Sequence, residues 1–505
     1  MTVDARPNEL VVTDPATGKV VGSVPDTSAD EVYRIAAELR MQQIAWDALG
    51  PKGRRPWLTK YADWMLANSD RIIDVLVSET GKVRPDAMLE VKATAEIIRY
   101  WADNAEKFLA DEREKAPNAM TLPKKLTKVY QPYPLVGVIT PWNFPVTLFL
   151  MDAIPALAAG CAVIEKPSEE TPLAAQLLVD GWRSIGAPGV LECITGGGAT
   201  GAAVVDAADY VQFTGSTATG KKIAAAAAGQ LKPYSLELGG KDPAVVLADA
   251  DIDRAVNGIA WGGLFNSGQV CISVERVYVE APIYDEFVTK LTDKVKSLSQ
   301  GVKEGSDVGA MVTSAQVDIV ERHVKEAVEA GARVTTGGKR GTTGNFFEPT
   351  VLVDVDHSMS CIKEETFGPT IPVMKVADAD EAIRMANDSI YGLSASVWTK
   401  DVARGEQVAR RIEAGAVNVN DVFSNLFAPP LPHNGWKDSG VGARAGGAYG
   451  IRKYCKVQAQ TSPRIPVMKN ELTWFPYTKR RSGIVSRFLD LVVGRGLRQR
   501  LGRAK

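Results

Sequence analysis

With 505 residues, of which 45% are hydrophobic and 24% charged, the chain is long enough for two or three domains and has the balance of a soluble globular protein. A formal net charge of -1 excludes the overall electric field by which many proteins attract nucleic acid. The sequence has no run of about 18 apolar residues and no signal peptide, so we expect a cytoplasmic protein without a transmembrane helix.

Cysteine and histidine are few and scattered. The five cysteines form neither CxxC pairs nor a disulfide framework, which fits a reducing compartment. The three histidines, His323, His357 and His433, are not spaced as metal ligands, and none stands beside Cys271. No metal is therefore predicted, and a carboxylate is favoured over histidine as the base for any thiol chemistry.

The first 108 residues predict a hairpin followed by packing helices. Residues 11–24 alternate apolar and polar side chains around a turn that contains Pro15 and Gly18. Ser28 and Glu31 have the spacing of a capping box, and apolar residues follow at helical intervals. Helical periodicity continues through residues 57–76 and 88–108, and we expect these helices to carry no chemistry.

From residue 135 short apolar runs alternate with helical segments. Strands are predicted at residues 135–139, 161–165, 190–194 and 210–213, and helices at 147–159, 172–185, 200–207 and 217–228. This alternation predicts an α/β fold with a doubly wound parallel sheet, in which ligands bind at the carboxyl ends of the strands. Asn143, Lys166, Gly215 and Ser216 stand at those ends.

A second alternating block begins near Lys241, with strands predicted at residues 244–247 and 274–279, and ends near Asn420. The hairpin-like residues 124–133 and a late strand at residues 452–459 fit neither block. The sequence thus predicts two α/β domains and an additional small sheet.

Four short motifs stand out along the chain: TPWNFP (140–145), LELGGK (236–241), NSGQVCIS (266–273) and EETFGP (364–369). The third places Cys271 between a flexible Ser-Gly turn and a β-branched strand. Taken alone, such a cysteine is more often a small buried apolar residue than a nucleophile. In this order and spacing, however, the four motifs resemble those of the aldehyde dehydrogenase superfamily, over about residues 10–461.

The resemblance implies a domain organisation. Residues 1–121 and 141–238 would form an NAD-binding domain and residues 239–430 a catalytic domain. Residues 122–140 and 451–470 would form a bridging sheet for oligomerisation, through which similar proteins assemble as homodimers or homotetramers.

The resemblance also implies a reaction. Cys271 would attack an aldehyde to give a thiohemiacetal, whose oxyanion the Asn143 amide and the Cys271 N–H would stabilise. Hydride transfer to nicotinamide would leave a thioester, and Glu237 would activate the water that hydrolyses it. Because similar enzymes that transfer the acyl group to coenzyme A commonly lack this carboxylate, Glu237 favours release of a free acid.

The turn at Gly215 and Ser216 admits three interpretations. A P-loop fits except that Lys222 stands where Ser or Thr must hold magnesium, and a purely structural turn is the second interpretation. The resemblance gives the third, in which the turn meets the pyrophosphate of NAD and Ser216 contacts it.

Further cofactor contacts follow from the resemblance. Lys166 and Glu169 would bind the adenosine ribose, and because Glu169 would repel a 2′-phosphate, NAD is favoured over NADP. Trp142 would also contact the cofactor, and Glu365 and Phe367 would hold the nicotinamide ribose and ring.

The substrate is less constrained. Some succinic semialdehyde dehydrogenases place an arginine where Met151 stands, so an apolar, medium-chain or aromatic aldehyde is favoured, with Phe265 and Phe427 as candidate walls. Succinic semialdehyde stays an alternative.

Three other functions stay open for the protein. It could be a Cys-dependent thioester or ester hydrolase, a P-loop-like ATPase, or a non-catalytic assembly protein.

The tail, residues 473–505, lies beyond the resemblance. Its predicted helix has one apolar face, made of Ile484, Val485, Phe488, Leu489, Val492 and Val493. Its end is basic, with Arg495, Arg498, Arg500, Arg503 and Lys505. Packing across a subunit interface is favoured over peripheral contact with an anionic membrane surface.

Overall fold

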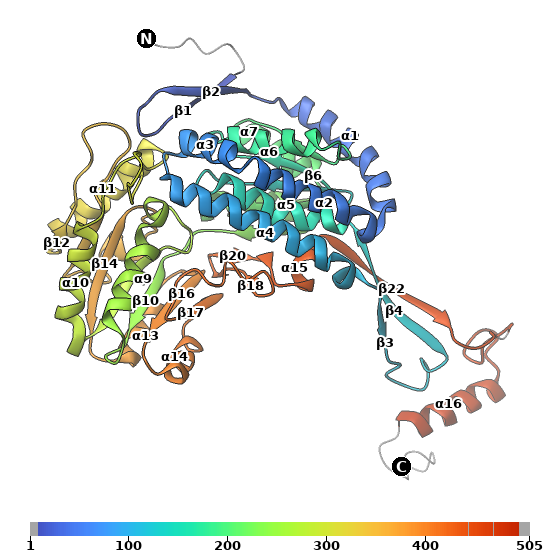
Figure 1. The fold of residues 1–505 in the computed structure, drawn as a ribbon. Coiled ribbons are helices and arrows are strands. Elements are labelled where there is room, and N and C mark those ends of the chain that lie inside the picture. The colour runs from blue at the N-terminus through green and yellow to red at the C-terminus, as the bar shows by residue number, and fades with distance from the viewer. Residues whose placement is uncertain (1–8, 443, 468, 494–505) are drawn as a thin grey trace. The chain divides into compact units, whose positions relative to one another are not determined.

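The computed structural model describes residues 9–442, 444–467 and 469–493. The described chain divides into two units, one of residues 9–108 and 132–454 and the other of residues 109–131 and 455–493 (Figure 1). The first unit contains both large sheets, so the expected cofactor and catalytic domains belong to one body.

The first sheet has six strands in the order β20-β9-β8-β5-β6-β7. They are β5 (Leu135–Ile139), β6 (Ala162–Lys166), β7 (Leu191–Cys193), β8 (Tyr210–Thr214), β9 (Tyr234–Glu237) and β20 (Gly440–Val441). All neighbours are parallel except β20, which runs antiparallel to β9. The predicted doubly wound sheet is confirmed, and strand β9, which carries Glu237, was not predicted.

Helices follow the strands of the first sheet. They are α5 (Pro145–Ala159), α6 (Leu173–Ser184), α7 (Gly198–Ala207) and α8 (Thr217–Gly229), each within about two residues of its predicted range. Every residue of α5 is buried, because its apolar sequence packs on the sheet on one side and on other helices on the other.

The N-terminal region supplies a hairpin and four helices. These are β1 (Glu9–Thr13), β2 (Val20–Pro25), α1 (Ala29–Ala48), α2 (Gly50–Ala67), α3 (Ser69–Thr80) and α4 (Arg84–Leu109). Ser28 caps α1 as predicted, but the Glu31 side chain pairs with Arg34 instead of completing the capping box. The helix expected over residues 57–76 is two helices, because the chain breaks at Asn68. Helices α1 and α2 pack against α5, α6 and α7 (Figure 1).

The second sheet has seven strands in the order β12-β13-β14-β11-β10-β16-β17, parallel except for β12. They are β10 (Asp242–Val246), β11 (Val274–Glu280), β12 (Arg333–Thr336), β13 (Thr350–Val353), β14 (Thr370–Val376), β16 (Ser394–Trp398) and β17 (Ala416–Val419). The helices of this region are α9 (Ile252–Leu264), α10 (Tyr284–Lys296), α11 (Ser314–Glu329), α13 (Ala379–Asn387) and α14 (Val402–Ala409). The second predicted α/β region is thereby confirmed.

The second unit contains a three-stranded sheet, β3 (Glu112–Glu114), β4 (Lys124–Pro132) and β22 (Cys455–Pro463), and helix α16 (Lys479–Val493). The expected bridging segments need correction at both inner ends. Strand β5 belongs to the first sheet and not to the 122–140 segment, and residues 448–452 form helix α15 (Ala448–Arg452) before β22 begins.

The tail contains the amphipathic helix that its sequence predicts, α16, whereas the basic positions from Arg495 to Lys505 lie outside the described residues. Within the described ranges, the structure has no helix that is both long and apolar enough to cross a membrane.

Candidate active site

Cys271 follows a turn of unusual backbone conformation. Asn266, Ser267 and Gly268 are all left-handed, with φ of 51°, 57° and 72°. Because non-glycine residues rarely adopt this conformation, the turn has to be held by its surroundings. Asp86 accepts the Asn266 N–H at 3.0 Å, and the Ser267 hydroxyl donates to a backbone carbonyl at 3.0 Å. The rest of the fold therefore fixes the backbone that carries Cys271.

The Cys271 thiol is partly exposed between two buried apolar neighbours, Val270 and Ile272. Burial raises the pKa of this thiol to about 12, and the positive charge of Arg444 opposes the shift. The thiol is therefore protonated before substrate binds and needs a base to react. Among the described residues, no acceptor pairs with the Cys271 N–H, which leaves this donor available to an oxyanion.

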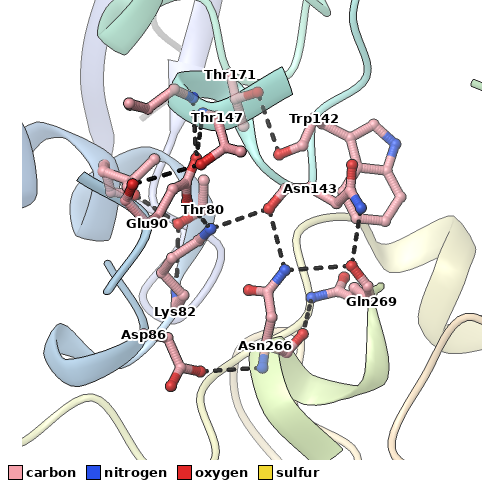
Figure 2. Close-up of polar contacts among 12 residues, drawn as sticks. Thr80, Lys82, Asp86, Glu90, Trp142, Asn143, Thr147, Thr171, Asn266 and Gln269 are labelled. Carbon is pink, nitrogen blue, oxygen red and sulfur yellow. Dashed lines mark hydrogen bonds and ion pairs between the residues drawn. The ribbon is translucent and has the colours of Figure 1, made fainter. Parts of the chain in front are cut away.

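Asn143 lies beside this turn (Figure 2). Its side-chain amide donates to the Gln269 carbonyl at 2.9 Å, which leaves the second amide hydrogen free to meet a substrate oxygen. The Asn266 amide donates to the carbonyl oxygens of both Asn143 and Gln269, at 3.0 and 3.3 Å. Backbone and side chain of Asn143 are thus both tied to the segment that carries Cys271.

A buried ion pair supports Asn143 from behind (Figure 2). The Lys82 ammonium lies 2.6 Å from Glu90 and donates to the Asn143 carbonyl at 2.9 Å. The second Glu90 oxygen accepts the N–H groups of Val146 and Thr147, at 2.9 and 3.1 Å, in the first turn of α5. This pair was not predicted from the sequence, because the N-terminal helices were expected to carry no chemistry.

Glu237 ends strand β9 and is only 3% exposed. Neither of its carboxylate oxygens has a hydrogen-bond partner among the described residues. The turn after it packs on the nucleophile, since a Cβ added to Gly240 would lie 2.4 Å from the Cys271 carbonyl oxygen. Burial raises the pKa of Glu237 to about 8, and Arg444 and Lys453 oppose the shift. A buried carboxyl of this kind is suited to take up and release a proton near neutral pH.

Three further charged side chains lie behind Glu237, and the sequence analysis missed them. Asp152 of α5, Arg444 of β21 (Arg444–Ala445) and Lys453 form ion pairs, with Arg444 at 2.5 Å and Lys453 at 3.8 Å from Asp152. One signal for them was visible, because Asp152 is the only charged residue in the apolar sequence of α5. A lone buried carboxylate requires a cationic partner.

A cavity opens onto Cys271 and Asn143. Its wall is mainly aromatic and aliphatic, with Phe144, Phe265, Phe423, Leu426 and Phe427 among the lining residues. Besides Cys271, only two lining side chains are titratable. Glu90 is neutralised by Lys82, and burial lowers the pKa of His433 to about 4, so this imidazole is uncharged near neutral pH. The lining therefore offers no cation to a ligand.

Phe265 and Phe427 line the cavity, as the sequence analysis expected, but Met151 does not. Met151 is buried on α5, and the residues of this helix that line the cavity are Thr147 and Leu148. The side chain at position 151 is therefore no part of the wall. The argument for an apolar ligand rests on the lining residues instead.

Lys166 and Glu169 lie together at the carboxyl end of β6, 3.3 Å apart, with Lys166 buried and Glu169 half exposed. Gly215 and Ser216 follow β8, where the Ser216 hydroxyl caps α8 by accepting the Thr219 N–H at 3.3 Å. No side chain fits at Gly215, because an added Cβ would lie 2.5 Å from the Phe213 ring. Free N–H groups of a helix N-terminus beside a Lys-Glu pair fit a dinucleotide at the carboxyl edge of the sheet.

Glu365, Phe367 and Trp142 form a second cluster. Glu365 accepts the Gly240 N–H at 3.0 Å, which places it against the turn after Glu237. Phe367 is left-handed, with φ of 49°, and its ring meets that of Trp142 edge to face at 5.4 Å. These contacts join Glu365 to the turn after Glu237 and Phe367 to the segment after β5, and the roles of the three residues in cofactor binding stay predictions. Among the described residues, no group of acidic, histidine or cysteine side chains is arranged to hold a metal ion.

Comparison with known proteins points to the same family as the four motifs. The family model described as "Aldehyde dehydrogenase family" matches residues 2–460. A Mycobacterium ulcerans protein named as a succinate-semialdehyde dehydrogenase [NADP(+)] is 38% identical, over 92% of this chain and 90% of the relative. The 4,4'-diapolycopene aldehyde oxidase of a Methylomonas species is 36% identical, over 96% and 91%.

A solved structure agrees as well. The NAD-dependent aldehyde dehydrogenase of Sinorhizobium meliloti superposes with a TM-score of 0.87 at 34% identity, over 93% of each chain. The motif resemblance, the double α/β fold and these matches lead to one conclusion: this chain is an NAD(P)-dependent member of the aldehyde dehydrogenase family.

Proposed function

We propose that the protein oxidises an apolar, medium-chain or aromatic aldehyde to the free carboxylic acid, with NAD as the oxidant. One observation carries this proposal: the cavity that leads to Cys271 is lined by aromatic and aliphatic side chains, and its lining has no cation. Apolar surface favours an apolar ligand by about 25 cal/mol for each Å² removed from water. The same lining gives no partner to a second carboxylate.

The residues of the site account for each proton and bond. The Cys271 sulfur bonds to the aldehyde carbon while the thiol proton passes to solvent water. The Asn143 amide and the Cys271 N–H stabilise the oxyanion. NAD, held by the residues named above, would supply the hydride acceptor, and loss of hydride from the adduct would leave a thioester on Cys271. Glu237 then takes a proton from the water that attacks the thioester, the C–S bond breaks, Glu237 returns this proton to the Cys271 sulfur, and the acid leaves.

Glu169 supports NAD over NADP. Its carboxylate is half exposed beside Lys166, at the strand end where the adenosine ribose is expected. A 2′-phosphate there would place two negative groups together, which is unfavourable unless a cation pairs with both. Relatives differ in this respect, since one is named for NADP and another for NAD. We expect Glu169→Gln to narrow the preference for NAD several-fold.

The deciding experiment follows NADH or NADPH formation with short, long, aromatic and carboxylated aldehydes, beside Cys271→Ala. We expect a signal with NAD and apolar aldehydes, lost in the variant. A signal without loss in Cys271→Ala would exclude Cys271 as the nucleophile. Activity confined to NADP would exclude the role given to Glu169.

Succinic semialdehyde is the second candidate substrate, because a relative at 38% identity is named for it. The cavity lining argues against it, since a buried carboxylate without a partner costs several kcal/mol. A kcat/KM for succinic semialdehyde above that for an apolar aldehyde of equal length would replace our proposal. The chemistry at Cys271 would be unaffected.

We also propose that the three-stranded sheet joins copies of this chain into a homodimer or homotetramer. Strand β22 lies at the sheet edge with exposed side chains from Lys456 to Pro463, and exposed strand edges favour pairing. Helix α16 exposes Ile484, Phe488 and Leu491, which would pack across the same interface. Sedimentation of the full chain beside a truncation after residue 472 tests the helix. Flotation of only the full chain with anionic liposomes would favour the membrane hypothesis instead.

A further inference from the structure

The helix α5 buries one charged residue, Asp152, in an otherwise apolar segment. Asp152 is 1% exposed and receives two bonds from the Arg444 guanidinium, Nη2 at 2.5 Å and Nε at 3.2 Å. The Tyr454 hydroxyl also donates to it, at 3.4 Å. An ion pair in this setting is costly to desolvate, which makes a purely stabilising role a poor explanation.

Lys453 adds a second cation to the same group. Its ammonium lies 3.8 Å from Asp152 and donates to the Gln212 side chain at 2.7 Å. Its side chain is 8% exposed, and burial lowers its pKa to about 8, against the attraction of Asp152. We call Asp152, Arg444 and Lys453 the charge cluster.

The charge cluster reaches the catalytic sheet through Thr214. The Arg444 guanidinium donates to the Thr214 hydroxyl, and Thr214 pairs in register with Glu237 on the neighbouring strand. Side chains of in-register neighbours point to the same face of a sheet. Arg444 therefore lies over the face from which Glu237 projects, and Glu237 responds to the charges of Arg444, Lys453 and Asp152.

We propose that the charge cluster sets the pH range in which Glu237 acts as the general base, an inference that rests on the role proposed above for Glu237. Below about pH 8, where Lys453 is protonated, the cluster holds two cations and one anion, a net charge of +1 facing a carboxylate that has no hydrogen bond among the described residues. A net positive charge stabilises ionised Glu237 against the cost of burial. Asp152 limits this effect by cancelling one of the two cations.

The other titratable groups near Glu237 are uncharged near neutral pH. Burial raises the pKa of the Cys271 thiol and of the Tyr210 and Tyr454 hydroxyls above 10, and lowers that of His433 to about 4. Glu165, which faces Asp152 from β6, has a pKa well above its ordinary value. The charge cluster is thus the main source of charge around Glu237, with Asp152 and Arg444 charged throughout and Lys453 charged below about pH 8.

This reasoning predicts shifts of opposite sign. Asp152→Asn raises the cluster charge to +2 and lowers the midpoint of Glu237 titration by about 1 pH unit, whereas Lys453→Gln removes the net charge and raises it by about as much. The double variant restores +1 and returns the midpoint towards that of the wild type. A role confined to packing would not produce opposite signs.

The direct measurement is an infrared titration of the full-length protein without substrate. The C=O band of protonated Glu237 is isolated by subtracting the spectrum of Glu237→Gln at each pH, because other buried carboxyls such as Glu365 also titrate near pH 8. Lys453→Arg keeps the charge and serves as the matched control. Lys290→Gln removes an exposed charge on α10 and controls for net charge.

A kinetic measurement complements it. After the first turnover, NADH forms at a constant steady-state rate. The midpoint of the pH profile of this rate should shift, in each variant, in the same direction as the infrared midpoint. Shifts of the same sign in both single variants, or shifts no larger than that of Lys290→Gln, would overturn the proposal. Should Asp152→Asn fail to fold, Lys453→Gln must still raise the midpoint while Lys453→Arg must not.

The two proposals can fail separately. If no aldehyde is oxidised but the infrared midpoints move as stated, the charge cluster stands and the proposed function falls. If aldehydes are oxidised through Cys271 and the midpoints do not move, only the charge cluster is excluded.

Discussion

The two sides of Cys271 are built on opposite principles. On the Asn143 side the main charges are paired at short distance, as Lys82 is with Glu90, and hydrogen bonds tie the amide to the nucleophile's turn. On the Glu237 side a buried carboxylate has no hydrogen bond among the described residues and faces a charge cluster at longer range.

The difference follows from what each side has to do. An oxyanion donor is effective when it is already in place, so its position is fixed by bonds that survive the reaction. A base has to gain and lose a proton in every cycle, and strong hydrogen bonds would hold it in one protonation state. The position of the Asn143 amide is thus fixed, whereas the protonation state of Glu237 can change.

The largest effect is expected from Glu237→Gln. Without the base, the thioester on Cys271 should form and persist, so a first turnover of NADH remains while steady-state turnover falls by about 10²–10⁴-fold. Rapid-mixing absorbance measures both phases. Glu286→Gln, which alters an exposed carboxylate on α10, is the matched control. Loss of the first turnover along with the steady state would assign Glu237 to the attack of the thiol as well.

Asn143→Ala should act on the other side. Loss of one oxyanion donor lowers kcat by about 10²–10³-fold, since removal of such a donor costs about 3–4 kcal/mol. The pH dependence of the remaining activity should match that of the wild type, because Asn143 does not titrate. Asn257→Ala removes an exposed amide on α9 and controls for the substitution. A shifted pH profile in Asn143→Ala would contradict the assignment of proton transfer to the Glu237 side alone.

Lys82→Met should lower the free energy of unfolding, because it removes the cation of the Lys82–Glu90 pair on the Asn143 side. It leaves Glu90 buried without its cation, and breaking such a pair costs about 3–5 kcal/mol of the free energy of unfolding. Urea denaturation measures the loss, and Lys82→Met with Glu90→Gln should recover part of it. Lys290→Met, in an exposed pair, should cost about 0–1 kcal/mol. A Lys82→Met protein as stable as the wild type would remove the ion pair from the support of Asn143.

The smallest effect is a pH dependence of stability on the Glu237 side. The pKa of Glu237 is raised from 4.5 to about 8, so the folded protein holds this proton more tightly than the unfolded chain. The resulting stability is complete below about pH 4.5 and is lost as the pH rises through about 8. Relative to Glu237→Gln, the wild type should lose on the order of 1–3 kcal/mol over that range. A constant difference between the two proteins would exclude the raised pKa.

Much of this architecture could be predicted because it depends on local patterns. The strands and helices around the first sheet alternate in apolar runs short enough to recognise, and Asn143, Lys166 and Ser216 were placed correctly at strand ends. Strand β9 was not predicted because its sequence, YSLE, is less apolar than the runs that predicted the other parallel strands of this sheet. The order and spacing of the motifs then predicted Glu237 and Cys271 as catalytic residues.

The charge cluster and the Lys82–Glu90 pair depend on contacts between distant segments. Arg444 is 292 positions from Asp152 in the chain, and no local pattern connects them. Met151 shows the opposite error: a position on α5 was assigned to the cavity wall, but the direction of a side chain on a fully buried helix depends on which neighbours pack around it. The roles of the cofactor residues remain predictions from motif and geometry together.

The aromatic lining of the cavity also bears on how a catalytic cycle ends. An aldehyde enters uncharged, but the acid that replaces it carries a negative charge at neutral pH. Phe265, Phe423 and Phe427 cannot solvate that charge, and ionised Glu237 repels it. Hydration outside the cavity is then the better environment for the product, so departure of the acid is downhill and its accumulation should inhibit the enzyme only weakly. The wall that we propose to select an apolar substrate would therefore also favour release of the product.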